Sequence, residues 1–579
     1  MKLIILIVGM LTHLSRAEST WVPPIGIPAP GFGIVEQAPA QPAAWPGVEA
    51  AGSYYIDNTN PLATDANTYG CPNIPRMTIP SQLVVVANSL VEIHGGPYLT
   101  TITSYAWLID SSTTNPPTGL APAFIKGFGH VVLGASQAAI NVGAASRIEM
   151  GRTDLRYTII EGIHFDNMPL GITGLTAHHV CIRNCETTNT HAEAMDVTPQ
   201  ESGTFHDIVF YSNLIHDTAD WNNTSSDWDY HGIGITTYGR TSATSLYNVW
   251  VLDNTFYHCS GDSVQVNADT AGNAALHHVY IGRNTAYENR QSGFWCKEAS
   301  HVIMSQNVIH TMNIVGSGLS GYGMGSQYGP DNLWFLFNEI YACQTGFGQS
   351  DSTHAVSGSK EYYVGNYIHD LIQPNHTDVN WNRPMGWAFQ MTNGVVERHI
   401  IDNTMVNIYG GLLAYAYGPI YFQNNIIENL RPNEWTAHGV YNNHIDLNFT
   451  TDVAIDHCLI YGVSGGTSQL ARVTCQNISY TTLASGQRGT GKFANCVQAD
   501  PLLVGVKLQA ASPAIDGGVQ ADVYQTFQTL YGIDIRRGFD GGRRPMGAGW
   551  DIGACEFNPP TPVIAPPKNP AVVPIPTPQ

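Results

Sequence analysis

The chain of 579 residues carries a net charge of −20 with His neutral, and only 12% of its residues are charged. This acidity argues against nucleic acid and anionic membrane surfaces as partners, because both repel a strongly negative protein. Gly is abundant, with 58 residues, and Asn, Thr, Ser and Tyr fill much of the remainder, which is typical of many short strands joined by tight turns. The spacings of the ten Cys match no zinc-binding pattern. The composition therefore predicts an all-β protein.

The N-terminus has the layout of a secretory signal peptide. Lys2 precedes the apolar run "LIILIVGML", and small residues lead to a cleavage position after Ala17. This run is too short to span a hydrocarbon core of about 30 Å. We therefore predict a signal peptide over residues 1–17 and a secreted protein, extracellular or at the cell surface, with no membrane association after cleavage.

Two Pro-rich segments flank the rest of the chain. Residues 18–53 contain "WVPPIGIPAPGFGIVEQAPAQPAAWPG", and residues 558–579 contain "NPPTPVIAPPKNPAVVPIPTPQ". Pro cannot donate a hydrogen bond inside a central strand, so both segments are expected to be extended arms. An open solenoid has unpaired strands at its ends, and the N-terminal arm is expected to help cover one of them.

A short apolar strand followed by Asn recurs along the chain, as in "WVLDN" and "VIMSQN". The recurring residues are Asn184, Asn213, Asn254, Asn284, Asn307, Asn338, Asn366, Asn403 and Asn425. The shortest step is 22 residues, and longer steps accommodate inserted loops. A strand-rich unit of this length predicts a parallel β-helix, in which three short strands close each coil. Asn suits the bend because it tolerates left-handed backbone, and its amide can hydrogen-bond to the same Asn of the next coil.

Motifs at both ends of this region resemble those of a known family. "YYIDNTNPLATDANTYGCPNIPRMTIP" and "VVVANSLVEIHGGPY" stand at the front, and "LQAASPAIDGG" and "WDIGACEF" at the back. With the repeats, they resemble the secreted right-handed parallel β-helix proteins of the pectin-lyase-like superfamily over residues 54–557. The resemblance implies one single-stranded right-handed solenoid with a C-terminal closing segment, a polysaccharide as partner, and a protein that we expect to be a monomer.

A second strand of each coil can be aligned by its Gly, as in "HGIGITT", "SGFWCKE" and "MGWAFQM". One apolar column then points into the core: Ile233, Val264, Phe294, Met324, Phe347 and Trp387. Alternation sends two columns outward: Gly234, Gln265, Trp295, Gly325, Gly348 and Ala388 in the first, and Thr236, Asn267, Lys297, Gln327, Ser350 and Gln390 in the second. The earlier coil "EAMDVTP" adds Asp196 and Thr198.

This polar face suits a long sugar chain. We predict that Asp196, Gln265, Asn267, Gln327 and Gln390 bind substrate. Trp295 is expected to offer a ring to the apolar face of a sugar, although single exposed aromatic residues are common on proteins without such a role.

The segment "HDTADWNNTSSDWDYHG" gathers acidic residues before this face. Asp217, Asp220, Asp227 and Asp229 are candidate ligands for Ca²⁺, which takes oxygen ligands, but the spacing is not that of an EF-hand and a solvated acidic loop is the alternative. His231, which ends this segment, and Asp262 occupy aligned positions in successive coils. These two are candidates for catalysis, or equally for a buried pair that holds the turn.

Lys297 is the candidate base of a polysaccharide lyase. β-Elimination on a uronate needs a neutralised carboxylate and a base that removes the C5 proton. In several lyase families of the superfamily the base is a Lys on an exposed strand with acidic calcium ligands nearby, and "SGFWCKEASHVIMSQN" resembles such a strand. The net acidity would repel a polyuronate unless calcium or local cations, for which Arg240 and Arg290 are candidates, intervene.

Two other functions fit the same scaffold. A glycoside hydrolase needs a pair of carboxyl groups, for which Asp196, Asp229, Asp262 and Glu298 are available. A non-catalytic surface or adhesion protein would use the polar columns to bind glycan alone. The fold does not discriminate among the three, and the lyase is the function we favour from the sequence.

Overall fold

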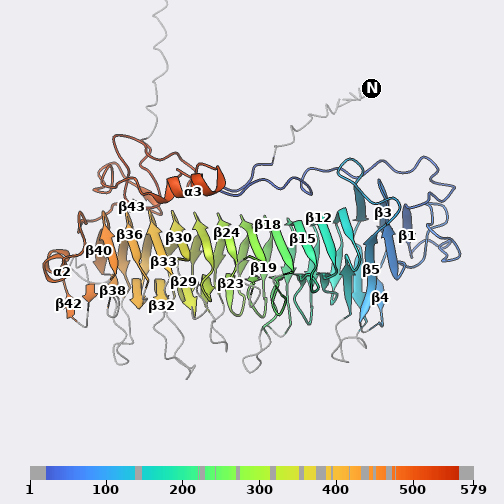
Figure 1. Ribbon diagram of the computed structural model, residues 1–579, viewed down its shortest axis with the longest axis horizontal. Coiled ribbons are helices and arrows are strands. Elements are labelled where there is room, and N and C mark those ends of the chain that lie inside the picture. The colour runs from blue at the N-terminus through green and yellow to red at the C-terminus, as the bar shows by residue number, and fades with distance from the viewer. Residues whose placement is uncertain are drawn as a thin grey trace, which may run out of the picture.

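The structure is a computed structural model, shown in Figure 1. It describes residues 21–102, 104–136, 146–219, 221, 229–241, 243–268, 274–312, 321–350, 358–372, 386–392, 396–415, 418–431, 443–447, 452–463, 473–475 and 478–559. The predicted signal peptide and most of the Pro-rich tail lie outside these residues.

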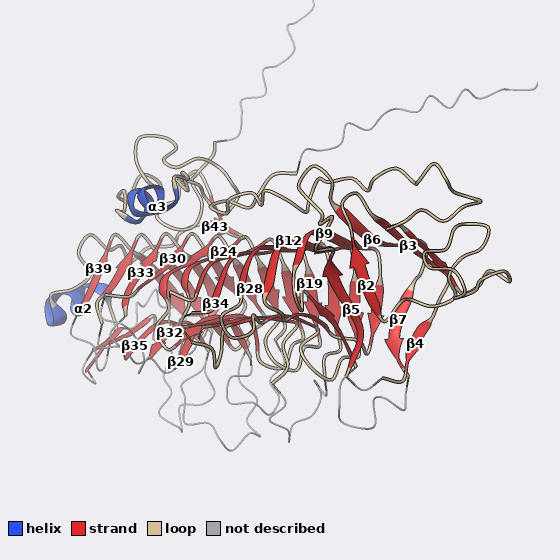
Figure 2. Cartoon of the chain, turned by 45° about the vertical axis from the view of Figure 1, so that its right-hand side comes forward, coloured by secondary structure: helices blue, strands red, loops and turns tan. Residues whose placement is uncertain are grey.

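Three long sheets run side by side along the molecule, and the chain visits each of them once per coil (Figures 1 and 2). In the described part of the chain, sheet A has 14 strands, sheet B has 13 and sheet C has 15. All pairs within them are parallel except the last pair of sheet C. The predicted all-β fold, a single-stranded right-handed parallel β-helix with three strands per coil, is confirmed.

The strands of sheet A are β1 (Tyr54–Asp57), β3 (Leu90–His94), β6 (Ala123–Gly127), β9 (Leu155–Glu161), β12 (Thr176–Arg183), β15 (Thr204–Tyr211), β18 (Ser245–Leu252), β21 (Leu276–Gly282), β24 (Ser300–Ser305), β27 (Asp331–Leu336), β30 (Lys360–Val364), β33 (Glu397–Ile401), β36 (Ile420–Gln423) and β39 (Val453–Asp456).

The strands of sheet B are β4 (Tyr98–Thr100), β7 (Val132–Ala135), β10 (His164–Asp166), β13 (Glu186–Thr188), β16 (Leu214–His216), β19 (Thr255–Tyr257), β22 (Thr285–Tyr287), β25 (Val308–His310), β28 (Glu339–Tyr341), β31 (Tyr367–His369), β34 (Thr404–Ile408), β37 (Ile426–Leu430) and β40 (Leu459–Val463).

The strands of sheet C are β2 (Gln82–Val85), β5 (Tyr105–Ser111), β8 (Arg147–Met150), β11 (Leu170–Ile172), β14 (Met195–Val197), β17 (Ile233–Thr236), β20 (Val264–Asn267), β23 (Ser292–Lys297), β26 (Tyr322–Gln327), β29 (Thr345–Ser350), β32 (Trp387–Thr392), β35 (Gly410–Tyr415), β38 (Ile445–Leu447), β41 (Val473–Cys475) and β42 (Ile478–Tyr480).

The segments after the last coil form a short hairpin and two helices. The hairpin pairs β43 (Leu503–Val504) with β44 (Lys507–Leu508), and the helices are α2 (Leu483–Thr490) and α3 (Val523–Tyr531). Helix α2 lies at the end of the solenoid, and α3 lies along the outer face of sheet A (Figure 1). Neither helix has the length and apolar character needed to cross a membrane.

A ladder of buried Asn side chains joins the coils at the corner between sheets A and B. The Asn284 Oδ1 accepts hydrogen bonds from the backbone N–H of Asn254 and from its Nδ2 at 2.9 and 3.0 Å. The Asn284 Nδ2 donates to the Asn307 Oδ1 at 3.0 Å and to the Val251 carbonyl at 2.8 Å. The same pattern links Asn213, Asn254, Asn284, Asn307, Asn338, Asn366, Asn403 and Asn425.

Two details of the predicted corner are corrected. Asn184 is not in the ladder, because Cys185 occupies that place and its N–H donates to the Asn213 Oδ1 at 3.0 Å. The left-handed backbone belongs to the residue before each ladder Asn, such as Asp253 (φ 56°), and not to the Asn itself. The bend and the amide ladder are therefore built by neighbouring residues.

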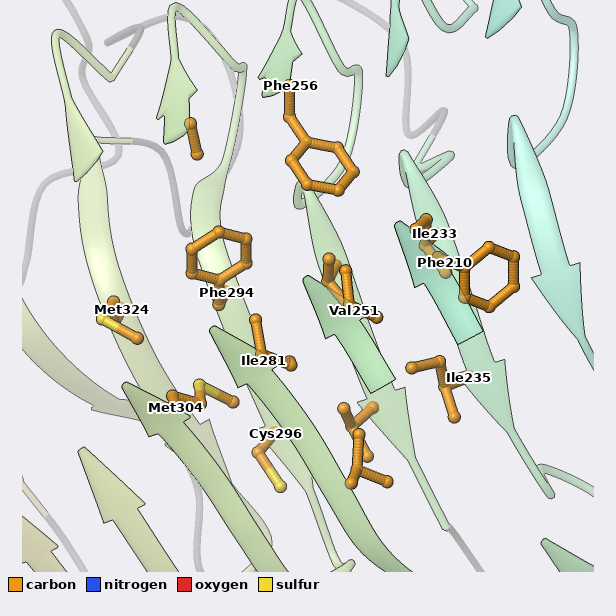
Figure 3. Close-up of a cluster of buried hydrophobic side chains, with 14 of the residues drawn as sticks. Phe210, Ile233, Ile235, Val251, Phe256, Ile281, Phe294, Cys296, Met304 and Met324 are labelled. Carbon is orange, nitrogen blue, oxygen red and sulfur yellow. The ribbon is translucent and has the colours of Figure 1, made fainter. Parts of the chain in front are cut away.

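The apolar column of sheet C fills the core as predicted, with one correction. Phe294 pairs with Val264 on one side and Met324 on the other. The Phe294 and Met324 side chains point into the coil (Figure 3), and Val264 is buried in the same core cluster. In the last aligned coil the residue in register with Phe347 is Phe389, not Trp387. The alignment by Gly fails there because Gly386, with φ 91°, precedes the strand and Ala388 takes the small-residue place opposite Gly346.

The N-terminal arm lies along the outer face of sheet A (Figure 1). Near its end, Trp45 packs edge-on against Tyr55 of β1, the first strand of this sheet, at 5.4 Å. Covering of a solenoid end by the arm stays a prediction. The Trp250 Nε1 donates to the Pro28 carbonyl at 2.8 Å, and Arg183 Nη1 donates to the Gly33 carbonyl at 2.7 Å. Arm residues pack into one apolar cluster with this face and with α3. The arm therefore buries outward apolar side chains that a solenoid alone would expose.

The Asn ladder generates a stability prediction. Asn284→Ala should lower the free energy of unfolding by about 3 kcal/mol or more, because it leaves the buried N–H groups of Asn254 without an acceptor. Urea denaturation measures this, and Asn73→Ala, at an exposed position, should change stability by less than about 0.5 kcal/mol. Equal stability of the two variants would contradict a structural role for the ladder.

Candidate functional site

A hollow of about 220 Å³ opens on the outer face of sheet C over β14, β17 and β20. Its lining residues are Glu193, Asp196, Thr198, His231, Gly234, Thr236, Tyr238, Gln265 and Asn267. Several of these belong to the two predicted outward columns, so the polar face is in register as the sequence indicated. The hollow is a candidate site on this face.

Gly234 forms the floor because it has no side chain. Its neighbours Ile233 and Ile235 point into the core, so alternation turns position 234 outward, between Asp196 and Gln265 of the adjacent strands. A Cβ at this position would lie 3.3 Å from the Glu193 Cγ and 3.9 Å from the Asp196 Cβ. The two carboxyl side chains therefore border the floor directly.

Asp196 is held by an Arg from two coils away. Arg147 Nη2 donates to both carboxylate oxygens of Asp196, at 3.0 and 3.2 Å. The Arg147 side chain reaches them by crossing Gly171, where a Cβ would lie 1.9 Å from Nη2. Burial raises the pKa of Asp196 to about 6, and the negative charge of Glu193 adds to this against the opposing effect of Arg147. Asp196 can thus carry a proton near neutral pH.

His231 and Asp262 come together, as predicted for a pair in successive coils. The backbone N–H of Asp262 donates to the His231 Nδ1 at 2.9 Å, so the neutral imidazole carries its proton on Nε2. The Asp262 carboxylate lies 3.7 Å from Nδ1 and accepts from Ser292 Oγ at 2.5 Å and from Gln265 Nε2 at 3.0 Å.

Of this pair, only His231 lines the hollow. Asp262 is 3% exposed, and burial raises the pKa of its carboxyl group. This geometry favours an orienting role for Asp262 over direct contact with a substrate.

Lys297 lies on the outward face one coil beyond the hollow. It is half-buried and stands in register between Asn267 and Gln327, which confirms its place in the second outward column. Among the described residues, its ammonium group has no hydrogen-bond or ion-pair partner, and its backbone carbonyl accepts from the Ala268 N–H at 3.0 Å. It does not line the hollow, so the structure separates Lys297 from His231 and Asp196.

Two aligned candidates are not available to a ligand. Trp295 is 1% exposed because its ring lies over Gly325, where a Cβ would be 2.2 Å from Cζ3, and edge-on to Tyr322 at 5.8 Å. Gln390 is also 1% exposed, and it pairs with Gly348 instead of standing in register with Ser350. The alignment placed Gln390 two residues out of register because it matched Gly386, which precedes the strand, to a Gly inside the neighbouring strand.

The two predicted cations are engaged elsewhere. Arg290 is 1% exposed, and its Nε donates to the Ser260 carbonyl at 2.7 Å. The Arg240 Nε donates to the Pro199 carbonyl at 3.0 Å. Neither residue lines the hollow. The cation nearest to its carboxyl groups is Arg147, which does not line the hollow but is bonded to Asp196.

The predicted calcium ligands are divided. Asp217 accepts from the ring nitrogens of His216 and His258 at 2.6 and 2.9 Å, at the end of β16. Asp229 lies near His231, with 3.9 Å between Oδ1 and Nδ1, whereas Asp220 and Asp227 lie outside the described residues. Neither described Asp belongs to a group of metal-ligating side chains. Calcium at this segment stays a prediction.

Sequence reasoning missed three residues that shape the hollow. Glu193 and Tyr238 lie outside the aligned strands, just before β14 and just after β17, and Tyr238 is 62% exposed. Arg147 enters from a strand that precedes the Asn repeats. The one hint in the sequence is Gly171, which leaves room for the Arg147 side chain to cross its strand. That hint can be interpreted only once the register of the neighbouring strands is known.

No protein-family model matches the chain, and no curated protein sequence is similar to it. Among solved structures, pectate lyase Pel9A has a TM-score of 0.40 at 12% identity, covering 88% of this chain and 98% of its own. The A-module of mannuronan C-5 epimerase AlgE4 of Azotobacter vinelandii has a TM-score of 0.33 at 14% identity, covering 58% and 90%.

PfbA, a surface adhesin of Streptococcus pneumoniae, has a TM-score of 0.34 at 9% identity, covering 70% of this chain and 92% of its own. Likeness at this level carries no information about the chemistry of the present chain. The site must therefore be interpreted from its own residues.

The Arg147–Asp196 contact generates a pH-dependent prediction. The pKa of Asp196 is raised from about 3.8 to about 6 in the folded protein. The stability that the protonated Asp196 contributes is therefore fully present below about pH 3.8 and is lost as the pH rises through 6. Arg147→Met removes the cation that limits this loss, so it should destabilise the protein more at pH 8 than at pH 5. Thermal melting at both pH values measures the difference.

Asp196→Asn provides the control, because it removes the titrating group. In that background Arg147→Met should lower the melting temperature equally at both pH values. A pH-independent effect of Arg147→Met in the parent would show that the ion pair does not act in the folded state.

Proposed function

We propose that the protein is a secreted carbohydrate-active enzyme that cleaves a polysaccharide lying across the outer face of sheet C, with the reacting sugar over Gly234. The observation that carries this proposal is the pair of carboxyl side chains, Glu193 and Asp196, beside a floor without a side chain. A glycine floor admits a sugar ring, and paired carboxyl groups are the usual means of glycosidic bond cleavage.

Glycoside hydrolysis is the reaction that the hollow supports best. Asp196, whose pKa is raised to about 6 by burial, is suited to donate a proton to the leaving oxygen. Glu193, on the same border of the floor, is the second carboxyl group and takes the role of base or nucleophile. The Arg147 guanidinium orients Asp196 through its two hydrogen bonds.

The remaining lining residues suit a neutral, hydroxyl-rich ligand. His231 offers an Nε2–H donor, and the Asn267 and Gln265 side chains offer amides. Tyr238 presents an exposed ring at the rim, against which the apolar face of a sugar can pack. The hollow therefore provides binding, orientation and proton transfer from side chains that are already in place.

β-Elimination on a uronate is the second candidate, and Lys297 is the observation in its favour. Its side chain stands on the polar face between Asn267 and Gln327, without an ion pair among the described residues. The two carboxyl groups of the hollow oppose this reaction, because they repel the carboxylate of a uronate and Arg147 is already paired. Calcium would supply the missing positive charge if it bound at the acidic segment.

Incubation with a panel of neutral and acidic polysaccharides distinguishes the reactions. Hydrolysis yields new reducing ends without unsaturated products, whereas β-elimination yields products that absorb in the ultraviolet, and a chelator tests the need for calcium. Binding of a glycan without either product would identify a non-catalytic binding protein and would overturn the proposed activity.

Asp196→Asn and Glu193→Gln should each lower kcat by about 10²–10⁴-fold, because each removes an acid–base group. Kinetics on a polysaccharide that the parent cleaves measure this, and Glu288→Gln, on an exposed corner of sheet B, should leave kcat within about twofold. The parent's rate should fall as the pH rises through about 6, where Asp196 loses its proton. Parent-like rates in both carboxyl variants would exclude hydrolysis at this hollow.

Lys297→Ala separates the two candidates. If hydrolysis is the reaction, this variant should keep kcat within about tenfold of the parent, because Lys297 lies outside the hollow. Loss of nearly all turnover, with unsaturated products in the parent and an unchanged melting temperature, would instead assign the reaction to β-elimination at Lys297.

A further inference from the structure

A cluster of His and Asp side chains lies on the outer face of sheet A, away from the hollow on sheet C. His179 comes from β12, and His206 and Asp207 come from the adjacent strand β15. One ligand atom from each of the three lies within 4.8 Å of the other two, and this is the one such group among the described residues. Nothing in the proposed cleavage of a polysaccharide uses these residues.

The backbone explains why they meet. His179 and Asp207 have φ values of 54° and 55° and occupy equivalent places in successive coils, between the paired positions on either side. This left-handed residue interrupts the alternation, so that two consecutive side chains face outward while Ala177 and Val180 remain buried. His206 and Asp207 are therefore neighbours in sequence on one face, next to His179.

Ring stacking orients both imidazoles. The His206 ring lies between the rings of His178 and Tyr247, at centroid distances of 5.1 and 5.0 Å and interplanar angles of 5° and 13°. The His179 ring stacks on Tyr157 at 4.4 Å. Because these contacts already restrict the rotamers of both imidazoles, binding of a ligand would cost little side-chain entropy.

The carboxylate of Asp207 is oriented as well. Its Oδ1 accepts a hydrogen bond from Asn248 Nδ2 at 3.1 Å, so the Oδ2 faces the two imidazoles. This Oδ2 lies 2.6 Å from the His206 Nδ1 and 3.9 Å from the His179 Nε2. Ligand atoms around a tetrahedral zinc ion are roughly 3.3 Å apart, given metal–nitrogen bonds of about 2.0–2.1 Å. Shifts of less than about 1 Å would satisfy that geometry.

We propose that His179, His206 and Asp207 form a binding site for a divalent transition-metal ion of the Zn²⁺ class, with water in the remaining coordination positions. Two imidazole nitrogens and one carboxylate oxygen suit Zn²⁺, whereas Ca²⁺ and Mg²⁺ require mostly oxygen ligands. The outward hydrogen bond from Asn248 to Asp207 is the kind of contact that orients a metal-binding carboxylate.

The site adjoins the docked N-terminal arm. The Phe32 ring lies edge-on to His179 and to Tyr157, at centroid distances of 6.0 and 5.5 Å. Arg183, on the same strand as His179, donates to the backbone carbonyls of Gly33 and Glu36. A bound ion would hold β12 and β15 in the arrangement that the arm contacts, and would therefore stabilise the docked arm.

Titration of the tag-free mature chain with zinc chloride tests the proposal. Isothermal titration calorimetry of the parent should show a site that is at least tenfold weaker in both His179→Gln and Asp207→Asn. Zinc should raise the melting temperature of the parent by binding to the folded state, and should slow proteolysis within residues 21–48, but not in the two variants.

His278→Gln is the matched control, because His278 is another left-handed residue of sheet A that stacks on a second imidazole, that of His301, at 4.8 Å. Its zinc affinity should equal that of the parent. Equal affinity of the parent and both cluster variants, no zinc binding by the parent, or displacement of zinc by equimolar calcium would each overturn the proposal.

Discussion

The structure depends on one constraint, the exact repetition of register from coil to coil, and buried amides enforce it. Each ladder Asn from Asn254 to Asn403 accepts two hydrogen bonds from the preceding coil and donates to the following one, as Asn284 does between Asn254 and Asn307. A coil that slipped by one residue would leave these buried groups unpaired and would turn its apolar side chains outward. Insertions are therefore confined to the connections between strands.

The candidate site is a local departure inside this regular frame. Positions that carry side chains in neighbouring strands carry none at Gly234 and Gly171, and the first absence creates the hollow while the second gives Arg147 its path to Asp196. Sheet C thus obtains a concave, charged site where one outward position lacks a side chain. Two of the lining residues, Glu193 and Tyr238, flank the strands and stand outside the register of the sheet.

The fold was predictable from the sequence, because its signal is repeated in every coil. The recurring Asn and the apolar column at Phe294 predict the fold even though two assignments were wrong: Asn184 was placed in the ladder, and the last coil was aligned on Gly386. The site was predictable only in part, because Asp196, His231 and Asn267 lie in or beside aligned strands, whereas Arg147 acts from two coils away through a specific rotamer. Exposure was the least predictable property: parity places Trp295 outward, but its burial depends on packing against Gly325 and Tyr322.

The docked arm has a consequence for the order of folding. Its residues are synthesised before any strand, yet Ile25 contacts Gln306 and Ser305 on β24, Pro28 contacts Trp250, and Gly33 contacts Arg183. The surface that receives the arm therefore does not exist until the coils from β12 to β24 have stacked. These contacts close loops of some 150 to 280 residues, so a segment that is synthesised before the coils is among the last to find its place.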